Sequence, residues 1–168
     1  MLSVPVYLGV FLVALSGLMF EIALTRIFSA TIWYHYAFVA ISVALLGWGL
    51  GGLVLQGLKR RWQPTLDGVA LLSLAYAGAI PLCLFLIVRF PFRQELLPLY
   101  FLAALLPFLL GGMVLSAVFD LRRTDASKLY FADLAGASLG ALAVTFVLSW
   151  LGGEAAVLSV ALAPAAAA

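Results

Sequence analysis

Long apolar runs separated by short charged segments dominate this chain. A helix needs roughly 20 apolar residues to cross about 30 Å of hydrocarbon, and five stretches without Lys, Arg, Asp or Glu reach that length. They cover residues 1–20, 27–58, 68–88, 96–119 and 134–153. A sixth uncharged run, 155–168, is shorter. The pattern predicts an all-α fold, a polytopic transmembrane helix bundle of five spans plus a partial sixth.

The second run is too long for a single span, and its first part holds Trp33, Tyr34, His35 and Tyr36. This composition is typical of an aromatic belt at a membrane interface, so we expect the helix to begin near Tyr36. A partial or truncated sixth apolar segment is expected at 154–168. The bundle is expected to occupy residues 1–153, with spans at about 4–24, 36–58, 67–89, 96–119 and 129–151.

Composition excludes several classes of protein. The 168 residues are 66% hydrophobic and 10% charged, whereas soluble domains have about 45–50% apolar and about 25% charged residues. The lipid bilayer is therefore the expected solvent. A net charge of +2 is too small for a nucleic-acid-binding surface. With Cys83 as the single cysteine, an intrachain disulfide or a cysteine-based metal site is excluded, and no cofactor is evident.

The basic residues between the spans predict an orientation. Six follow the second span or lie between the fourth and fifth, whereas the alternate segments hold three, namely Arg26, Arg89 and Arg93. The positive-inside rule then predicts an integral membrane protein, of the bacterial inner membrane, with a cytoplasmic N-terminus. The six are Lys59, Arg60, Arg61, Arg122, Arg123 and Lys128.

Small residues recur at helical spacing in three spans. A Gly-x-Gly-x-x-Gly pattern begins at Gly47, but a membrane span precedes it where a dinucleotide site requires a strand. We interpret these positions as places where helices approach closely, and favour packing within the bundle over docking of another protein. The predicted helix-packing residues are Gly47, Gly51, Gly111, Gly112, Ala132, Gly136 and Gly140.

Four titratable residues form the candidate polar cluster: Glu21, Arg26, His35 and Asp133. Ionisable groups near apolar spans face a partner or a water-filled cavity, so a proton or ion relay is one interpretation. We favour an interfacial cluster that anchors the first helical hairpin, and for Asp133 a structural role near a helix start. Nucleophile–base pairs, paired carboxylates and metal-ligand spacing are absent from the sequence, so catalytic, cofactor-binding and metal-binding residues are predicted to be none.

The Glu21-x-x-x-Thr25-Arg26 pattern within residues 16–53 and the glycine-spaced run at residues 129–140 together resemble the membrane-bound spermidine synthase-like family. Residues 16–53, SGLMFEIALTRIFSATIWYHYAFVAISVALLGWGLGGL, resemble its first helical hairpin, with Glu21, Thr25 and Arg26 in the family's Glu-x-x-x-Thr-Arg position. Residues 129–140, LYFADLAGASLG, look like a later helix of the same family. The two stretches together cover about a third of the chain.

The resemblance implies a multi-spanning module that in longer relatives accompanies a Rossmann-like aminopropyltransferase domain, which would bind decarboxylated S-adenosylmethionine and a polyamine. The residues after Gly153 lack a polar βαβ pattern and a glycine-rich cofactor loop. Catalysis therefore carries over to no residue of this chain. Glu21, Arg26, Tyr130 and Asp133 carry over only as family-like positions.

We expect a non-catalytic accessory or scaffold subunit of a larger membrane complex, because small-residue faces are present and a catalytic set is not. Its expected partners are the lipid bilayer and other membrane protein subunits; a bioenergetic complex is suggested by fold-level analogy alone, and nucleic acid is not expected. Two alternatives stay open. One is the membrane part of a truncated polyamine aminopropyltransferase-like enzyme, and the other is a small transporter or channel.

Overall fold

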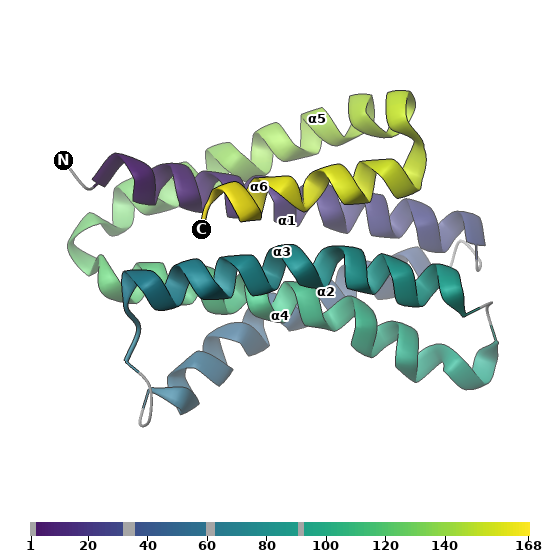
Figure 1. The fold of residues 1–168 in the computed structure, drawn as a ribbon, viewed down its shortest axis with the longest axis horizontal. Coiled ribbons are helices and arrows are strands. Elements are labelled where there is room, and N and C mark those ends of the chain that lie inside the picture. The colour runs from purple at the N-terminus through teal and green to yellow at the C-terminus, as the bar shows by residue number, and fades with distance from the viewer. Residues whose placement is uncertain (1–2, 32–35, 60–62, 91–92) are drawn as a thin grey trace.

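A computed structural model of the chain describes residues 3–31, 36–59, 63–90 and 93–168. Five long helices run along one axis (Figure 1), and each is long and apolar enough to cross a membrane. Strands do not occur in these four ranges, so the predicted all-α class with five helices of spanning length is confirmed. The long helices are α1 (Ser3–Thr31), α2 (Tyr36–Leu58), α3 (Leu66–Arg89), α4 (Leu97–Leu121) and α5 (Ala126–Val160).

Three short elements complete the chain. The 3-10 turns η1 (Gln94–Leu96) and η2 (Arg123–Asp125) lead into α4 and α5, and α6 (Leu162–Ala166) follows α5. Local chemistry sets the helix starts. The N–H of Gly68 donates to the Thr65 hydroxyl at 3.1 Å, which caps α3. Pro98 lies in the first turn of α4, where its missing N–H is not needed.

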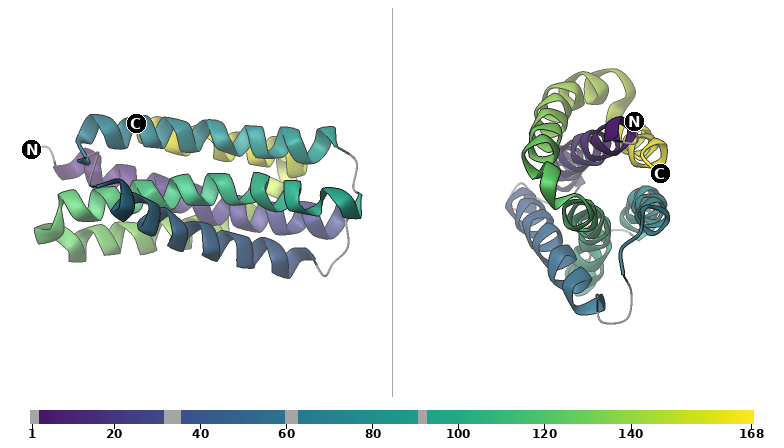
Figure 2. Two further views of the ribbon diagram at one scale, coloured as in Figure 1. Left: turned by 90° about the horizontal axis from the view of Figure 1, so that it is seen from below. Right: turned by 90° about the vertical axis from the view of Figure 1, so that its left-hand side faces the viewer.

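Helices α1 and α4 form the centre of the bundle, as the end-on view in Figure 2 shows. Helix α1 packs against α2, α4, α5 and α6, whereas α4 packs against α1, α2 and α3. The side chains between them are large and apolar. The rings of Phe20 and Phe108 lie 5.1 Å apart, and Phe108 also faces Trp48 at 6.3 Å.

One polar contact lies in this apolar interior. The hydroxyl groups of Ser16 in α1 and Tyr76 in α3 are hydrogen-bonded at 3.1 Å, and the Ser16 hydroxyl also donates to the Val13 carbonyl at 2.8 Å. Both residues are fully buried. Because a buried polar group without a partner is costly, the pair satisfies groups that would otherwise oppose burial of this face of α3.

The chain reverses direction at Gly152, inside the segment that forms α5. Gly152 has φ 78° and ψ 173°, a backbone conformation that is open to glycine and strained for other residues. The segment 153–167, called the returning limb, then runs back beside α1 and α3 (Figure 1). A Cβ at Gly153 would lie 3.6 Å from Ile27, and one at Gly9 would lie 3.5 Å from the Ala167 carbonyl. The limb is thus antiparallel to α1 and covers about 22 Å, less than the hydrocarbon thickness of about 30 Å.

Helices α1 and α5 are parallel and approach through glycine. A Cβ at Gly136 would lie 2.9 Å from the carbonyl carbon of Phe11, and one at Gly140 would lie 2.5 Å from the carbonyl oxygen of Leu15. From the first contact to the second, the chain advances by four residues in both α1 and α5, so the two helices run in the same direction. The predicted packing residue Ala132 is buried on this side too, in a cluster with Leu129. Backbone therefore meets backbone, which only small residues permit.

The glycines of α2 and α4 make a second close contact. A Cβ at Gly47 would meet the Phe108 side chain at 2.5 Å, and one at Gly51 would meet the Met113 nitrogen at 2.7 Å. From the other side, Gly111 and Gly112 face Trp48 of α2. The small-residue faces of α2, α4 and α5 thus all pack within this chain.

Replacing Gly136 with alanine is expected to destabilise the bundle by about 1–3 kcal/mol, because a methyl group there overpacks the α1–α5 contact. Gly78→Ala is the matched control, since a Cβ at Gly78 meets no atom within 4 Å. Reversible unfolding in mixed detergent–SDS micelles, followed by circular dichroism, measures both. Equal unfolding midpoints for the two variants would contradict the packing contact.

Candidate functional site

A pocket of about 680 Å³ opens at one end of the bundle. It lies where α1 and α3 end, where α4 begins and where α5 bends back. Its volume is within the range of about 300–1,000 Å³ that is usual for small-molecule sites. The lining residues are Ile22, Arg26, Ile27, Ala30, Leu84, Ile87, Val88, Phe90, Tyr100, Thr145, Leu148, Ser149, Gly153 and Glu154.

Half of the residues that line the pocket are aliphatic, and helical spacing places several of the lining residues on shared helix faces. Ile22, Arg26 and Ala30 are each four residues apart, so they share one face of α1. Leu84 and Ile87 supply the opposite wall from α3 by the same rule. An apolar molecule or an acyl chain would find contact surface on both sides.

The polar groups of the pocket come from three helices. Arg26 belongs to α1, Tyr100 to α4, and Thr145, Ser149 and Glu154 to α5. The Ser149 hydroxyl donates to the Thr145 carbonyl at 2.7 Å. A few polar groups on an otherwise apolar wall are the usual arrangement for fixing the orientation of a bound molecule.

Tyr100 connects two elements at the pocket. Its hydroxyl donates to the carbonyl of Phe90 at 2.5 Å, and its side chain is 2% exposed. Phe90 is the residue that follows α3, and its N–H in turn donates to the Leu86 carbonyl. The hydrogen bond from Tyr100 to Phe90 joins the start of α4 to the end of α3 and thereby fixes one edge of the pocket.

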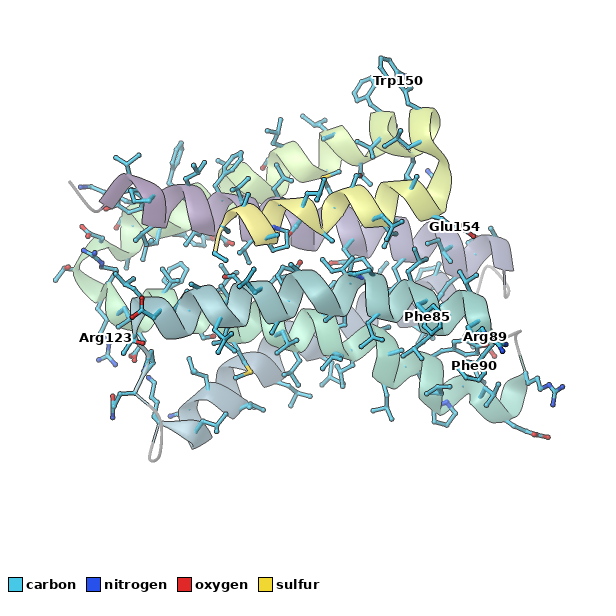
Figure 3. The ribbon with its side chains drawn as sticks, viewed as in Figure 1. Phe85, Arg89, Phe90, Arg123, Trp150 and Glu154 are labelled. Atoms are coloured by element: carbon cyan, nitrogen blue, oxygen red, sulfur yellow. The ribbon has the colours of Figure 1, made fainter. Side chains whose placement is uncertain are left out.

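Glu154 owes its place to the reversal at Gly152. The bend turns the chain back toward α1, so Glu154 lies at the same end of the molecule as Arg89 and Phe90, as Figure 3 shows. In the sequence, Glu154 stands out only as the boundary between two apolar runs. The sequence feature that could have indicated a bend is the pair of adjacent glycines, Gly152 and Gly153, directly before this carboxylate.

The members of the predicted polar cluster lie in different places. Arg26 lines the pocket, whereas Glu21 is half-buried on another side of α1. The register of Gly136 against Phe11 puts Asp133 about 20 Å along the axis from Glu21. The structure therefore does not bring Asp133 to Glu21 and Arg26. His35 lies outside the described residues.

The opposite end of the bundle carries four of the described basic residues, Lys59, Arg122, Arg123 and Lys128, whereas Arg26, Arg89 and Arg93 lie at the pocket end. Asp120 at the end of α4 forms an ion pair with Lys59 at 2.9 Å and accepts a hydrogen bond from the Arg123 Nε at 3.2 Å. Figure 3 shows Arg123 at the end away from Glu154. A smaller hollow of about 310 Å³ lies beside this ion pair. Lys59 and Arg123, the two cations that line this hollow, are both paired with Asp120. The hollow therefore has fewer unpaired charged groups for a ligand than the larger pocket has.

Comparison of the chain with protein-family models, with curated proteins and with solved structures finds no match. The resemblance to the membrane-bound spermidine synthase-like family therefore stays a prediction. In the part of the chain that the structure describes, no group of three or more His, Cys, Asp or Glu side chains converges as a metal site would require.

Tyr100→Phe is expected to destabilise the bundle by about 1 kcal/mol, because the Phe90 carbonyl loses its donor. Tyr130→Phe is the control, since Tyr130 is 57% exposed on α5 and does not line the pocket. The midpoint of unfolding in mixed micelles measures the difference. A shift as large for Tyr130→Phe as for Tyr100→Phe would contradict a specific role of the Tyr100 hydroxyl.

Proposed function

We propose that this chain is an integral membrane protein that binds a small amphiphilic molecule in the pocket between α1, α3, α4 and α5. The single observation that carries the proposal is the pocket itself, about 680 Å³ with aliphatic walls and with Arg26 and Glu154 among its lining residues. Binding requires no catalytic group. The proposed role therefore agrees with a sequence in which a catalytic set is not found.

Large apolar side chains on the outer surface support the membrane location. Phe38 of α2 is 72% exposed, Phe131 of α5 is 74% exposed and Trp150 of α5 is 87% exposed. Trp150 projects away from the bundle in Figure 3. Exposed apolar surface on this scale favours a lipid environment over water. In that setting the five long helices cross the bilayer.

The distribution of basic residues supports an orientation. Lys59, Arg122, Arg123 and Lys128 lie at the end of the bundle where α1 begins. By the positive-inside rule this end is cytoplasmic, and a bacterial inner membrane fits the same rule. The pocket then opens on the side away from the cytoplasm. A ligand would enter from that side or from the outer half of the bilayer.

The packing within the chain disfavours two of the three roles expected from the sequence, the accessory subunit and the transporter or channel. An accessory subunit was expected because of the small-residue faces, but Gly47, Gly112 and Gly136 are occupied by contacts within the chain. A transporter or channel needs a polar path between the two ends. Phe20 and Tyr76 instead fill the interior, at 1% and 0% exposure. Both features support ligand binding at one end over docking or conduction.

The orientation is tested by labelling introduced cysteines in a Cys83→Ala background. Arg93→Cys, at the pocket end, is expected to react with a membrane-impermeant maleimide in intact spheroplasts. Thr124→Cys, at the basic end, is expected to react only after the membrane is permeabilised. Both native residues are exposed, so accessibility reports the side of the membrane. The reversed pattern would overturn the orientation.

The pocket is tested by filling it. Ala30 lines the pocket, so Ala30→Trp is expected to lower binding of dihexanoylphosphatidylethanolamine at least about tenfold by removing the space for it. Ala75→Trp is the control, since Ala75 is exposed on α3 away from the pocket. Native mass spectrometry of the full chain in a non-ionic detergent counts bound molecules. Equal binding by the two variants would remove the pocket as the site.

A further inference from the structure

The pocket contains one group of each charge. Arg26 enters from α1 and Glu154 from the start of the returning limb. Among the residues that the structure describes, these two form no ion pair with each other. Two ion pairs occur among the described residues, and Asp120 takes part in both of them, at the end of the bundle away from the pocket. The guanidinium and the carboxylate are therefore each available to a bound molecule.

Charges at the edge of the hydrocarbon are costly unless they are compensated. A purely anionic ligand would satisfy Arg26 and leave Glu154 beside a like charge, and a cationic ligand would do the reverse. A molecule with both charges compensates the two residues and adds no net charge to the site. The aliphatic walls at Ile22, Ile87 and Leu148 would then cover its apolar part.

We infer that the ligand of this pocket, if the proposed binding function holds, is a zwitterionic amphiphile. Its phosphate or carboxylate group meets the Arg26 guanidinium, whose planar fork suits bidentate contact with either anion. Its ammonium group meets the Glu154 carboxylate. Its apolar part lies against the aliphatic walls from α1, α3 and α5.

Two sources supply this chemistry. One is the headgroup of an aminophospholipid, which carries a phosphate, an ammonium group and acyl chains. The other is a free apolar α-amino acid, which carries a carboxylate, an ammonium group and an aliphatic side chain. Dihexanoylphosphatidylethanolamine and leucine are therefore the two probes, and dihexanoylphosphatidylglycerol is the anionic comparison with the same acyl chains.

The experiment titrates these probes against the purified full chain and its variants, with binding followed by native mass spectrometry. The wild type is expected to bind at least one zwitterionic probe about tenfold more tightly than the anionic one. Glu154→Gln is expected to remove this preference, and Arg26→Gln to weaken both phospholipid probes. The exposed residues Glu95 and Arg93, at the same end but outside the pocket, supply the controls Glu95→Gln and Arg93→Gln.

An exchange of the two charges separates a ligand contact from a fold defect. The double variant Arg26→Glu, Glu154→Arg is expected to recover zwitterion binding lost in either single reversal, because a zwitterion can bind in the opposite orientation. Preference for phosphatidylethanolamine supports a lipid source, and preference for leucine supports a free amino acid.

Two results would overturn the inference in distinguishable ways. Equal binding of phosphatidylethanolamine and phosphatidylglycerol, still abolished by Ala30→Trp, would refute the zwitterion and leave the pocket function intact. Binding of none of the probes by the wild type, or binding that Ala30→Trp leaves unchanged, would refute both the zwitterion and the pocket function.

Discussion

The contact between the backbones of α1 and α5 determines how most of this molecule is arranged. Gly136 and Gly140 let α5 lie against the Phe11 and Leu15 carbonyls, and the two parallel helices are thereby held in close contact. The bend at Gly152 then falls beside Ile27, near the end of α1. This approach holds the end of α5 beside α1, where α5 supplies one wall of the pocket.

Packing in this bundle uses shape more than polarity. Lipid is as apolar as the core side chains, so burial alone gives helices little reason to associate. Glycines at the α1–α5 and α2–α4 contacts allow close approach, and ring contacts such as Phe20 with Phe108 fill the centre. The Ser16–Tyr76 hydrogen bond adds a directional contact between α1 and α3. The pocket lies where α1 and α3 end, beyond the glycine-mediated contacts between the helices.

Charge is divided between the two ends of the bundle. At the basic end, Asp120 binds Lys59 and Arg123, so part of the charge is neutralised within the fold. At the pocket end, Arg26 and Glu154 line a space and are not paired with each other. The ion-paired charges and the pocket-lining charges are thereby separated along the axis of the bundle.

The sequence by itself determined the helices, because uninterrupted apolar runs and charged junctions are local properties. It also indicated Gly47 and Gly136 as positions of close helix approach, because small residues that recur every four positions can be recognised in the sequence alone. Only the tertiary structure decided which helices those glycines meet, and it separated Asp133 from Arg26 by the register of α5 on α1. It likewise brought Glu154 to the pocket, because a reversal at one glycine joins segments that are far apart in sequence.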